Sequence, residues 1–145
     1  MRATEYFARG CDPSTLVVRQ IMEDAVVTTS PASSAMGVAE LLSEQSFGSL
    51  PVVDEDGILR GLVTEFDLLK AVEQGKDLRA VAVSDIMTKD VVTTTEETPI
   101  MNLIHLLQER HLIRVPVVKD HKLVGMVARR DVVFAYVKAR AIYWP

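Results

Sequence analysis

The stretch GLVTEFDLLKA (Gly61–Ala71) returns later in the chain as GMVARRDVVFA (Gly125–Ala135). Both copies keep the glycine and the aspartate in the same places, but Thr64 of the first copy is replaced by Ala128 in the second. Upstream of these, VRQIMEDAVVTTSP (18–31) matches VSDIMTKDVVTTTE (83–96) at a similar offset. The chain therefore contains an internal repeat of about 65 residues.

Composition limits the classes of protein that need to be considered. The 145 residues are 48% hydrophobic and 25% charged, which is typical of a globular chain with its own core. The net charge of −4, with acids and bases interleaved, gives no sign of a nucleic-acid or anionic-membrane surface. One cysteine, no apolar run long enough to cross a bilayer and no signal-peptide pattern together predict a cytoplasmic protein.

The two repeats show the same order of predicted elements. Apolar β-branched runs predict strands, helical spacing of apolar residues predicts helices, and paired runs around a polar turn predict hairpins. The second long helix is predicted to begin with Thr98 as N-cap and Pro99 as its first residue. In chain order the prediction gives strands at 25–29 and 90–94, helices at 33–45 and 98–111, hairpins at 50–64 and 115–128, and closing helices at 65–75 and 130–140.

We therefore expect an α+β fold of two β-α-β-β-α repeats. A unit of about 60 residues is marginal alone, so we expect the repeats to pack sheet to sheet with pseudo-two-fold symmetry. The predicted division is an N-terminal segment (1–15), repeat 1 (16–73), a linker (74–80), repeat 2 (81–138) and a C-terminal tail (139–145).

The order of motifs resembles a known family. V-x-x-I-M, then a run ending in Thr-Thr, then h-P-V-V-D and G-h-h-[TS]-x-x-D is similar to the CBS domain, named after cystathionine β-synthase, over residues 16–138. The resemblance implies a tandem, non-catalytic pair with two clefts between the repeats. It also implies adenosine ligands (AMP, ADP, ATP, S-adenosylmethionine, sometimes NAD) and usually a dimer.

The same resemblance assigns candidate ligand-binding residues. In the family the aspartate takes the ribose and the Ser/Thr helps to bind the phosphate; one carboxylate can accept hydrogen bonds from both ribose hydroxyls. The first cleft would use Gly48, Ser49, Thr64 and Asp67, and the second would use Arg114, Arg129, Arg130 and Asp131.

Thr64 and Asp67 also have a purely structural interpretation. Thr-x-x-Asp is a variant of the capping box, in which both side chains satisfy backbone groups at a helix N-terminus. Ala128 cannot cap, yet Asp131 stays at the same offset from Gly125, which favours a ligand role for the aspartate. Capping and ligand binding both remain open for this motif.

Losing the threonine need not empty the second cleft, because arginine offers a fork of donors that matches phosphate. The first copy has Ser49, Glu65 and Phe66 at the positions of Arg114, Arg129 and Arg130. We therefore expect the Asp131 cleft to prefer phosphorylated ligands. The Asp67 cleft should prefer a less charged ligand or be empty. A solvated-surface role for the arginines is the alternative.

By resemblance, the adenine base sits against backbone and apolar walls of the other repeat. For the Asp131 cleft this indicates Arg19, Ala25, Phe47 and Gly48, and for the Asp67 cleft Ser84, Asp90, Leu112 and Ile113. Plain core packing is the competing expectation for Phe47, Leu112 and Ile113.

Other chemistry is sparse. His105, His111 and His121 show no metal-ligand spacing and are expected to be solvated. Cys11 has no paired base, so we expect neither nucleophilic catalysis nor any other enzyme activity. The C-terminal aromatics would either pack on the N-terminal segment or form a dimer interface; the residues concerned are Tyr6, Phe7, Phe134, Tyr136, Tyr143 and Trp144.

Three functions follow from these patterns. The first is a stand-alone, energy-sensing regulatory module that binds an adenosine nucleotide and signals to an unknown partner protein. The second is a structural or homodimerisation module without a ligand. The third, a nucleic-acid-binding role, is disfavoured by the acidic charge balance.

Overall fold

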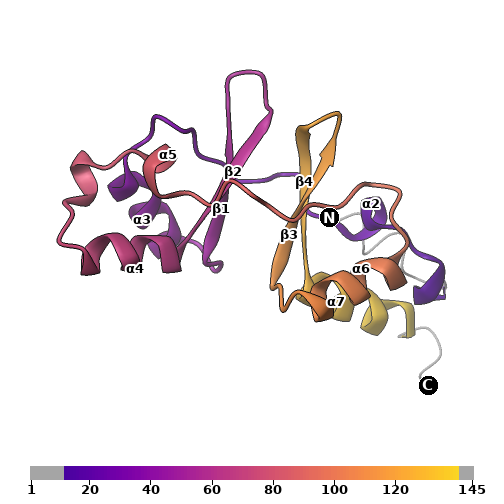
Figure 1. Ribbon diagram of the computed structural model, residues 1–145. Helices are drawn as coiled ribbons and strands as arrows, with labels where there is room; N and C mark the ends of the chain where they lie inside the picture. The colour runs from indigo at the N-terminus through magenta and orange to yellow at the C-terminus, as the bar shows by residue number, and fades with distance from the viewer. Residues whose placement is uncertain (1–11, 141–145) are drawn as a thin grey trace. The chain divides into compact units, whose positions relative to one another are not determined.

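The computed structural model describes residues 12–140, which form two compact units. The described part of unit 1 comprises residues 12–26, 92–120 and 124–140, and unit 2 comprises residues 27–91 and 121–123. Among these residues, no helix is both long and apolar enough to cross a membrane. Both units are α+β, and each contains a two-stranded hairpin with helices packed beside it (Figure 1).

Unit 2 is built on the hairpin of the first repeat. Val52, Val63 and Leu50 of this hairpin are fully buried, and Val38 of the preceding helix packs into the same core. Burying each such side chain contributes about 1.5–3 kcal/mol. The elements are α3 (Ala35–Glu44), β1 (Ser49–Val53), β2 (Leu59–Thr64), α4 (Glu65–Glu73), the 3-10 turn η2 (Leu78–Ala80) and the short helix α5 (Val83–Ile86).

Unit 1 repeats this plan around the second hairpin. Its core gathers Val115, Val117 and Val127 from the strands with Leu103 of the long helix, all at most 1% exposed. The elements are the 3-10 turn η1 (Pro13–Thr15), the short helix α2 (Val18–Ile21), α6 (Ile100–Glu109), β3 (Arg114–Lys119), β4 (Lys122–Ala128) and α7 (Arg129–Arg140).

The predicted hairpins and long helices are confirmed. Strands β1 and β2 pair antiparallel with Ser49 opposite Thr64, so the end of β2 and the start of α4 lie beside the first residue of β1. Helix α4 ends where Gly75 adopts a left-handed φ of 77°, and Lys76 N–H then donates to Ala71 O. This ending separates α4 from the linker.

The strands predicted at 25–29 and 90–94 are wrong. Each segment contributes only one bridge residue: Thr29 pairs in parallel with Val52, and Thr94 pairs in parallel with Val117. Thr29 N–H donates to Pro51 O, and Val53 N–H donates to Thr29 O. The β-branched composition therefore predicts extended backbone correctly, but only one residue in each segment reaches the edge of the hairpin.

The predicted start of α6 is wrong by one residue. Pro99 is the N-cap, with φ −60° and ψ 144°, and the helix begins at Ile100. Thr98 lies one residue too early to cap. Its hydroxyl instead accepts a hydrogen bond from Thr95 N–H at 3.3 Å.

The opening segment of each repeat lies in the unit that holds the hairpin of the other repeat. Helix α2 opens the first repeat but belongs to unit 1, where Val18 and Ile21 are fully buried with the second hairpin. Helix α5 opens the second repeat but belongs to unit 2, where Val83 is fully buried with the first hairpin. Neither short helix was predicted from the sequence.

Paired backbone hydrogen bonds attach these opening segments to the hairpins. Thr88 and Leu62 exchange two N–H to O bonds of 2.8 and 2.9 Å in unit 2. Glu23 and Met126 do the same at 2.8 and 2.9 Å in unit 1. Each exchange satisfies the N–H and the carbonyl of one residue on the outer edge of β2 or β4, the second strand of its hairpin.

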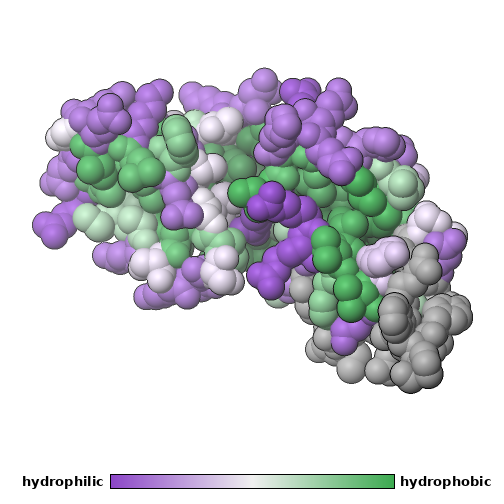
Figure 2. Space-filling model, turned by 90° about the horizontal axis from the view of Figure 1, so that it is seen from below, coloured by the Kyte–Doolittle hydropathy of each residue, from purple (hydrophilic) through white to green (hydrophobic). Residues whose placement is uncertain are grey.

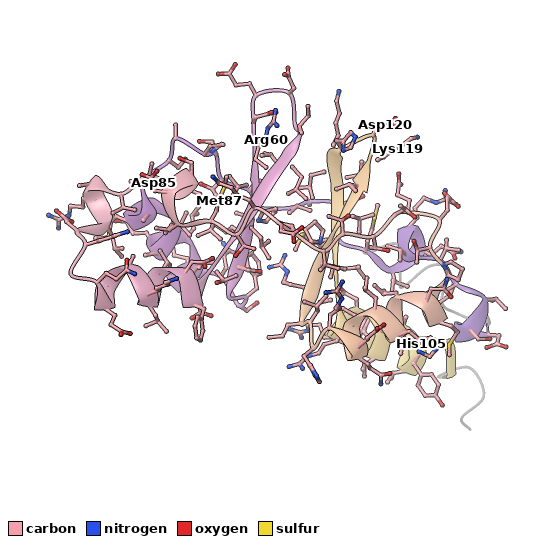
Figure 3. All side chains as sticks on the ribbon, in the orientation of Figure 1. Arg60, Asp85, Met87, His105, Lys119 and Asp120 are labelled. Atoms are coloured by element: carbon pink, nitrogen blue, oxygen red, sulfur yellow. The ribbon has the colours of Figure 1, made fainter. Side chains whose placement is uncertain are left out.

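The two repeated glycines lie directly under the methionines of the opening segments. A Cβ on Gly61 would come within 2.7 Å of both Met87 Sδ and Thr88 O, and Figure 3 shows Met87 beside β2. A Cβ on Gly125 would come within 2.7 Å of Met22 Sδ and 2.9 Å of Glu23 O. Only glycine fits at these positions, which explains why both copies keep it.

Alanine at either glycine should therefore destabilise the fold. We expect Gly61→Ala and Gly125→Ala each to lower the free energy of unfolding by about 1–3 kcal/mol, because a backbone oxygen cannot move aside for the added methyl group. The measurement is urea unfolding of each variant. Gly37→Ala in α3 is the matched control, since its Cβ would meet only Ser34 Oγ at 3.4 Å. The control should be neutral or gain about 0.5–1 kcal/mol; equal stability of all variants would contradict the close packing.

Candidate functional site

Thr64 and Asp67 form a complete capping box at the start of α4. Asp67 N–H donates to Thr64 Oγ1 at 3.1 Å, and Thr64 N–H donates to Asp67 Oδ2 at 2.9 Å. The Thr64 hydroxyl also donates to Asp67 Oδ2, at 3.0 Å. The capping prediction is confirmed. These bonds involve only Oδ2, and they hold the carboxylate at a fixed place on the helix N-terminus.

Gly48 and Ser49 lie at the same end of unit 2. Ser49 is 7% exposed and stands opposite Thr64 in the hairpin register. Gly48 O accepts a hydrogen bond from Glu65 N–H at 2.9 Å, which ties the residue before β1 to the first residue of α4. The structure thus brings together four residues predicted from the sequence, here named the Asp67 set: Gly48, Ser49, Thr64 and Asp67.

Asp131 occupies the equivalent place at the start of α7. Its Oδ2 accepts a hydrogen bond from Ala128 N–H at 2.8 Å, which reproduces one half of the capping box. The other half is missing because Ala128 has no hydroxyl. Asp131 is nevertheless only 5% exposed, whereas Asp67 is partly exposed.

Arginines surround Asp131 in unit 1. Arg114, the first residue of β3, is half-buried; burial lowers the pKa of its guanidinium, and the Asp131 carboxylate partly opposes this by raising it. Arg129 and Arg130 are exposed in the first turn of α7. Cations at a helix N-terminus oppose the helix dipole, so these two arginines do not stabilise α7. The Asp131 set is Arg114, Arg129, Arg130 and Asp131.

The residues predicted to contact a base divide between the units. Arg19 and Ala25 are exposed in unit 1 with Asp131, and Arg19 forms an ion pair with Glu97. Ser84, half-buried in α5, and the exposed Asp90 belong to unit 2 with Asp67.

The three apolar candidates behave differently from one another. Phe47 packs against the core of unit 2, and Leu112 packs against the core of unit 1. The core expectation is wrong for Ile113, which is 60% exposed. Its carbonyl accepts Arg129 N–H at 2.9 Å, which fixes the backbone before β3 without burying the side chain.

Sequence reasoning did not identify the position of the Glu65 side chain. A Cβ on Gly48 would come within 2.2 Å of Glu65 Oε1, so the carboxylate of Glu65 lies directly against Gly48. The signal in the sequence was the contrast between Glu65 and Arg129 at equivalent positions. Nothing local indicated that the glutamate would lie against a residue 17 positions earlier.

The remaining chemical candidates give no second site. His105, His111 and His121 are exposed, as expected (Figure 3 labels His105). Between residues 12 and 140, no three His, Cys, Asp or Glu side chains gather as metal ligands would. Phe134 is half-buried and Tyr136 is 51% exposed. The expectations for Tyr6, Phe7, Cys11, Tyr143 and Trp144 lie outside the described residues.

Unit 1 also contains a hollow of about 280 Å³, away from the Asp131 set. Its walls come from η1, α6 and α7, and it includes neither Asp131 nor the arginines around it. The lining is mainly apolar: Asp12, Ser14, Leu16, Ile100, Met101, Ile104, Val132, Ala135 and Tyr136.

Curated relatives are similar over most of this chain. The CBS domain-containing protein YhcV of Bacillus subtilis is 31% identical over 115 residues, covering 79% of this chain and 81% of that protein. Other relatives are longer. The chain spans 60% of protein MK0525 of Methanopyrus kandleri and 23% of the L-aspartate semialdehyde sulfurtransferase of Methanocaldococcus jannaschii, each 33% identical. Similar repeats therefore occur both in small proteins and within enzymes.

Solved structures match both repeats. CBSX2 in complex with AMP is 30% identical, with a TM-score of 0.77 over 86% of this chain and 98% of that chain. The CBS domain pair of protein MJ0100, in complex with 5′-methylthioadenosine and S-adenosyl-L-methionine, is also 30% identical, with a TM-score of 0.74 over 84% and 96%. A family model described as CBS domain matches residues 18–74 and 83–138. The chain therefore belongs to the CBS domain family, as a tandem pair of CBS domains.

Proposed function

We propose that this chain is a cytoplasmic, non-catalytic regulatory module that binds adenosine compounds of the AMP, ADP and ATP class. The observation that carries the proposal is Asp131, a carboxylate only 5% exposed, held at a helix N-terminus beside a half-buried arginine. Related CBS pairs have been solved with AMP and with S-adenosylmethionine, which supports an adenosine ligand here.

Each aspartate matches the chemistry of a ribose. A vicinal diol has two hydroxyl donors, and a carboxylate whose position is already fixed can accept both in charge-assisted hydrogen bonds. The capping bonds at Asp67 and Asp131 reduce the entropy that would be lost in ordering these side chains on binding. Capping and binding are therefore compatible roles of the same residue.

The Asp131 set is suited to a phosphorylated ligand. Arg114 lies close enough to Asp131 for the carboxylate to raise the pKa of the guanidinium against the effect of burial. Arg129 and Arg130 are in the first turn of α7. A phosphate at this helix N-terminus would meet backbone N–H groups and arginine donors, and would neutralise cations that oppose the helix dipole. We assign AMP or a related nucleotide to this set.

Regulation follows if the ligand binds two arrangements of the protein unequally. The ligand can shift the population only by its differential affinity, and a partner protein would respond to that shift. Sensitivity to the adenylate pool would make the module an energy sensor.

The proposal includes a homodimer. Helix α4 exposes Phe66, Leu69 and Val72 at 79%, 65% and 56%, and α7 exposes Val133, Tyr136 and Val137 at 63%, 51% and 58%. Phe66, Leu69 and Val72 are three residues apart, and Tyr136 and Val137 lie three and four residues after Val133, so each trio shares one side of its helix. Figure 2 shows hydrophobic residues exposed on one face of the molecule. Apolar helix faces of this kind are typical of interfaces, so a dimerisation module is also the second candidate function if no ligand binds.

The ligand proposal predicts a specific loss on substitution of Arg114. AMP at about 100 times its dissociation constant should add about 2.7 kcal/mol of stability, a rise of several degrees in the unfolding midpoint. In Arg114→Ala we expect AMP affinity to fall about tenfold or more, because a charge-assisted bond is lost. Calorimetric titration measures the affinity, with Arg79→Ala, an exposed arginine in η2, as the control. Equal AMP binding by all three proteins would contradict the assignment.

The dimer proposal predicts that acidic residues on these faces separate the subunits. Leu69→Asp combined with Val133→Asp should convert a dimer to a monomer, because two buried charges would be unpaired in the interface. Sedimentation velocity measures the mass. Met101→Asp, at an apolar position of α6 that is 46% exposed, is the matched control. A monomeric wild-type protein at tens of micromolar would rule out the dimer.

A further inference from the structure

Residues of opposite charge stand at one equivalent position of the two repeats, Glu65 beside the Asp67 set and Arg129 in the Asp131 set. Glu65 N–H donates to Gly48 O at 2.9 Å, and Arg129 N–H donates to Ile113 O at 2.9 Å. The two residues therefore make the same backbone hydrogen bond in their respective repeats. The side chains differ: Glu65 begins α4 and Arg129 begins α7. A substitution at this point changes the local charge by two units without altering the local hydrogen bonding.

The carboxylate of Glu65 lies close to the Asp67 set. A Cβ built on Gly48 would come within 2.2 Å of its Oε1, so the carboxylate occupies space that a side chain at residue 48 would otherwise fill. Within residues 12–140, the Glu65 side chain has no hydrogen bond and no ion pair. Its negative charge is therefore not neutralised by a neighbouring cation.

The positions next to Glu65 and Asp67 supply no compensating positive charge. Ser49 stands where unit 1 has Arg114, and Phe66 stands where it has Arg130. Asp67 adds a second carboxylate in the first turn of α4. A phosphate placed here would be repelled by two acids, and the donors beside it, helix N–H groups and hydroxyls, carry no full positive charge.

We propose that Glu65 is a specificity-determining residue, which makes the Asp67 set reject phosphates and select an adenosine compound with an uncharged or cationic 5′ substituent. A sulfonium or an ammonium group on that substituent would pair with the Glu65 carboxylate. The inference rests on the proposed adenosine function and deepens it: the two sets of one chain recognise ligands whose 5′ substituents differ in charge.

The test measures binding to the Asp67 set alone. In an Asp131→Asn background, which replaces the carboxylate of unit 1 by a neutral amide with a single acceptor oxygen, we titrate AMP and S-adenosylmethionine by calorimetry. S-adenosylmethionine should bind more tightly than AMP. Glu65→Arg should raise AMP affinity about tenfold and lower S-adenosylmethionine affinity about tenfold, and Glu65→Gln should give intermediate values. Glu73→Arg, at the exposed end of the same helix, changes the charge equally and should leave the preference unchanged.

A second measurement covers the case in which Asp131→Asn does not fold. In the otherwise natural chain, Glu65→Arg should increase the AMP stoichiometry from one to two per chain. An acid in the first turn also favours the helix dipole, and this purely structural role would lower the unfolding midpoint of Glu65→Arg without changing ligand preference.

The outcomes separate the two proposals. If the natural chain binds neither AMP nor S-adenosylmethionine, the adenosine function itself is overturned. If it binds them, but Glu65→Arg and Glu73→Arg show the same preference and stoichiometry as the natural chain, the adenosine function stands and the role of Glu65 is overturned.

Discussion

Both units depend on a single type of contact, in which a methionine and a backbone edge from one repeat close over a glycine in the hairpin of the other. Met87 covers Gly61, and Met22 covers Gly125. The paired hydrogen bonds of Thr88 and Glu23 set the register of the contact, because they fix which strand residue lies under the methionine. The hydrophobic cores then build on a hairpin that is held on both edges: by Thr29 or Thr94 on one strand and by the opening segment on the other.

This arrangement also determines where the ligand-binding candidates can lie. The strand that carries the glycine ends three residues later, at Thr64 or Ala128, and leads directly into α4 or α7. The aspartates therefore occupy the same place relative to each hairpin, whatever side chains surround them. Around the two aspartates, the replacement of Ser49, Glu65 and Phe66 by Arg114, Arg129 and Arg130 changes the local charge. One scaffold thus holds two chemically distinct surroundings for the same carboxylate.

Much of this could be predicted from the sequence, because periodicity and turn chemistry report local structure. Hairpins, long helices and the Thr64–Asp67 cap are local, and all were predicted. The prediction of a strand at 25–29 was wrong because strand pairing depends on a distant partner that local sequence does not identify. Helix α5 was missed because four residues are too few to show helical periodicity. The position of Glu65 against Gly48 is a contact between residues that only the folded hairpin brings together. Ile113 was expected in the core because it is apolar, but the direction of its side chain depends on the local backbone conformation, which the residue type does not determine.

The exchange of opening segments also bears on how such a chain can arise by duplication. A chain with a single repeat would have a hairpin whose glycine is uncovered and an opening segment with no strand to pair with. It could complete its unit only with a second molecule, so its folding would depend on concentration. Joining two repeats in one polypeptide makes the same exchange intramolecular, with an effective concentration set by the linker. Tandem duplication therefore turns an obligatory association between molecules into a property of one chain.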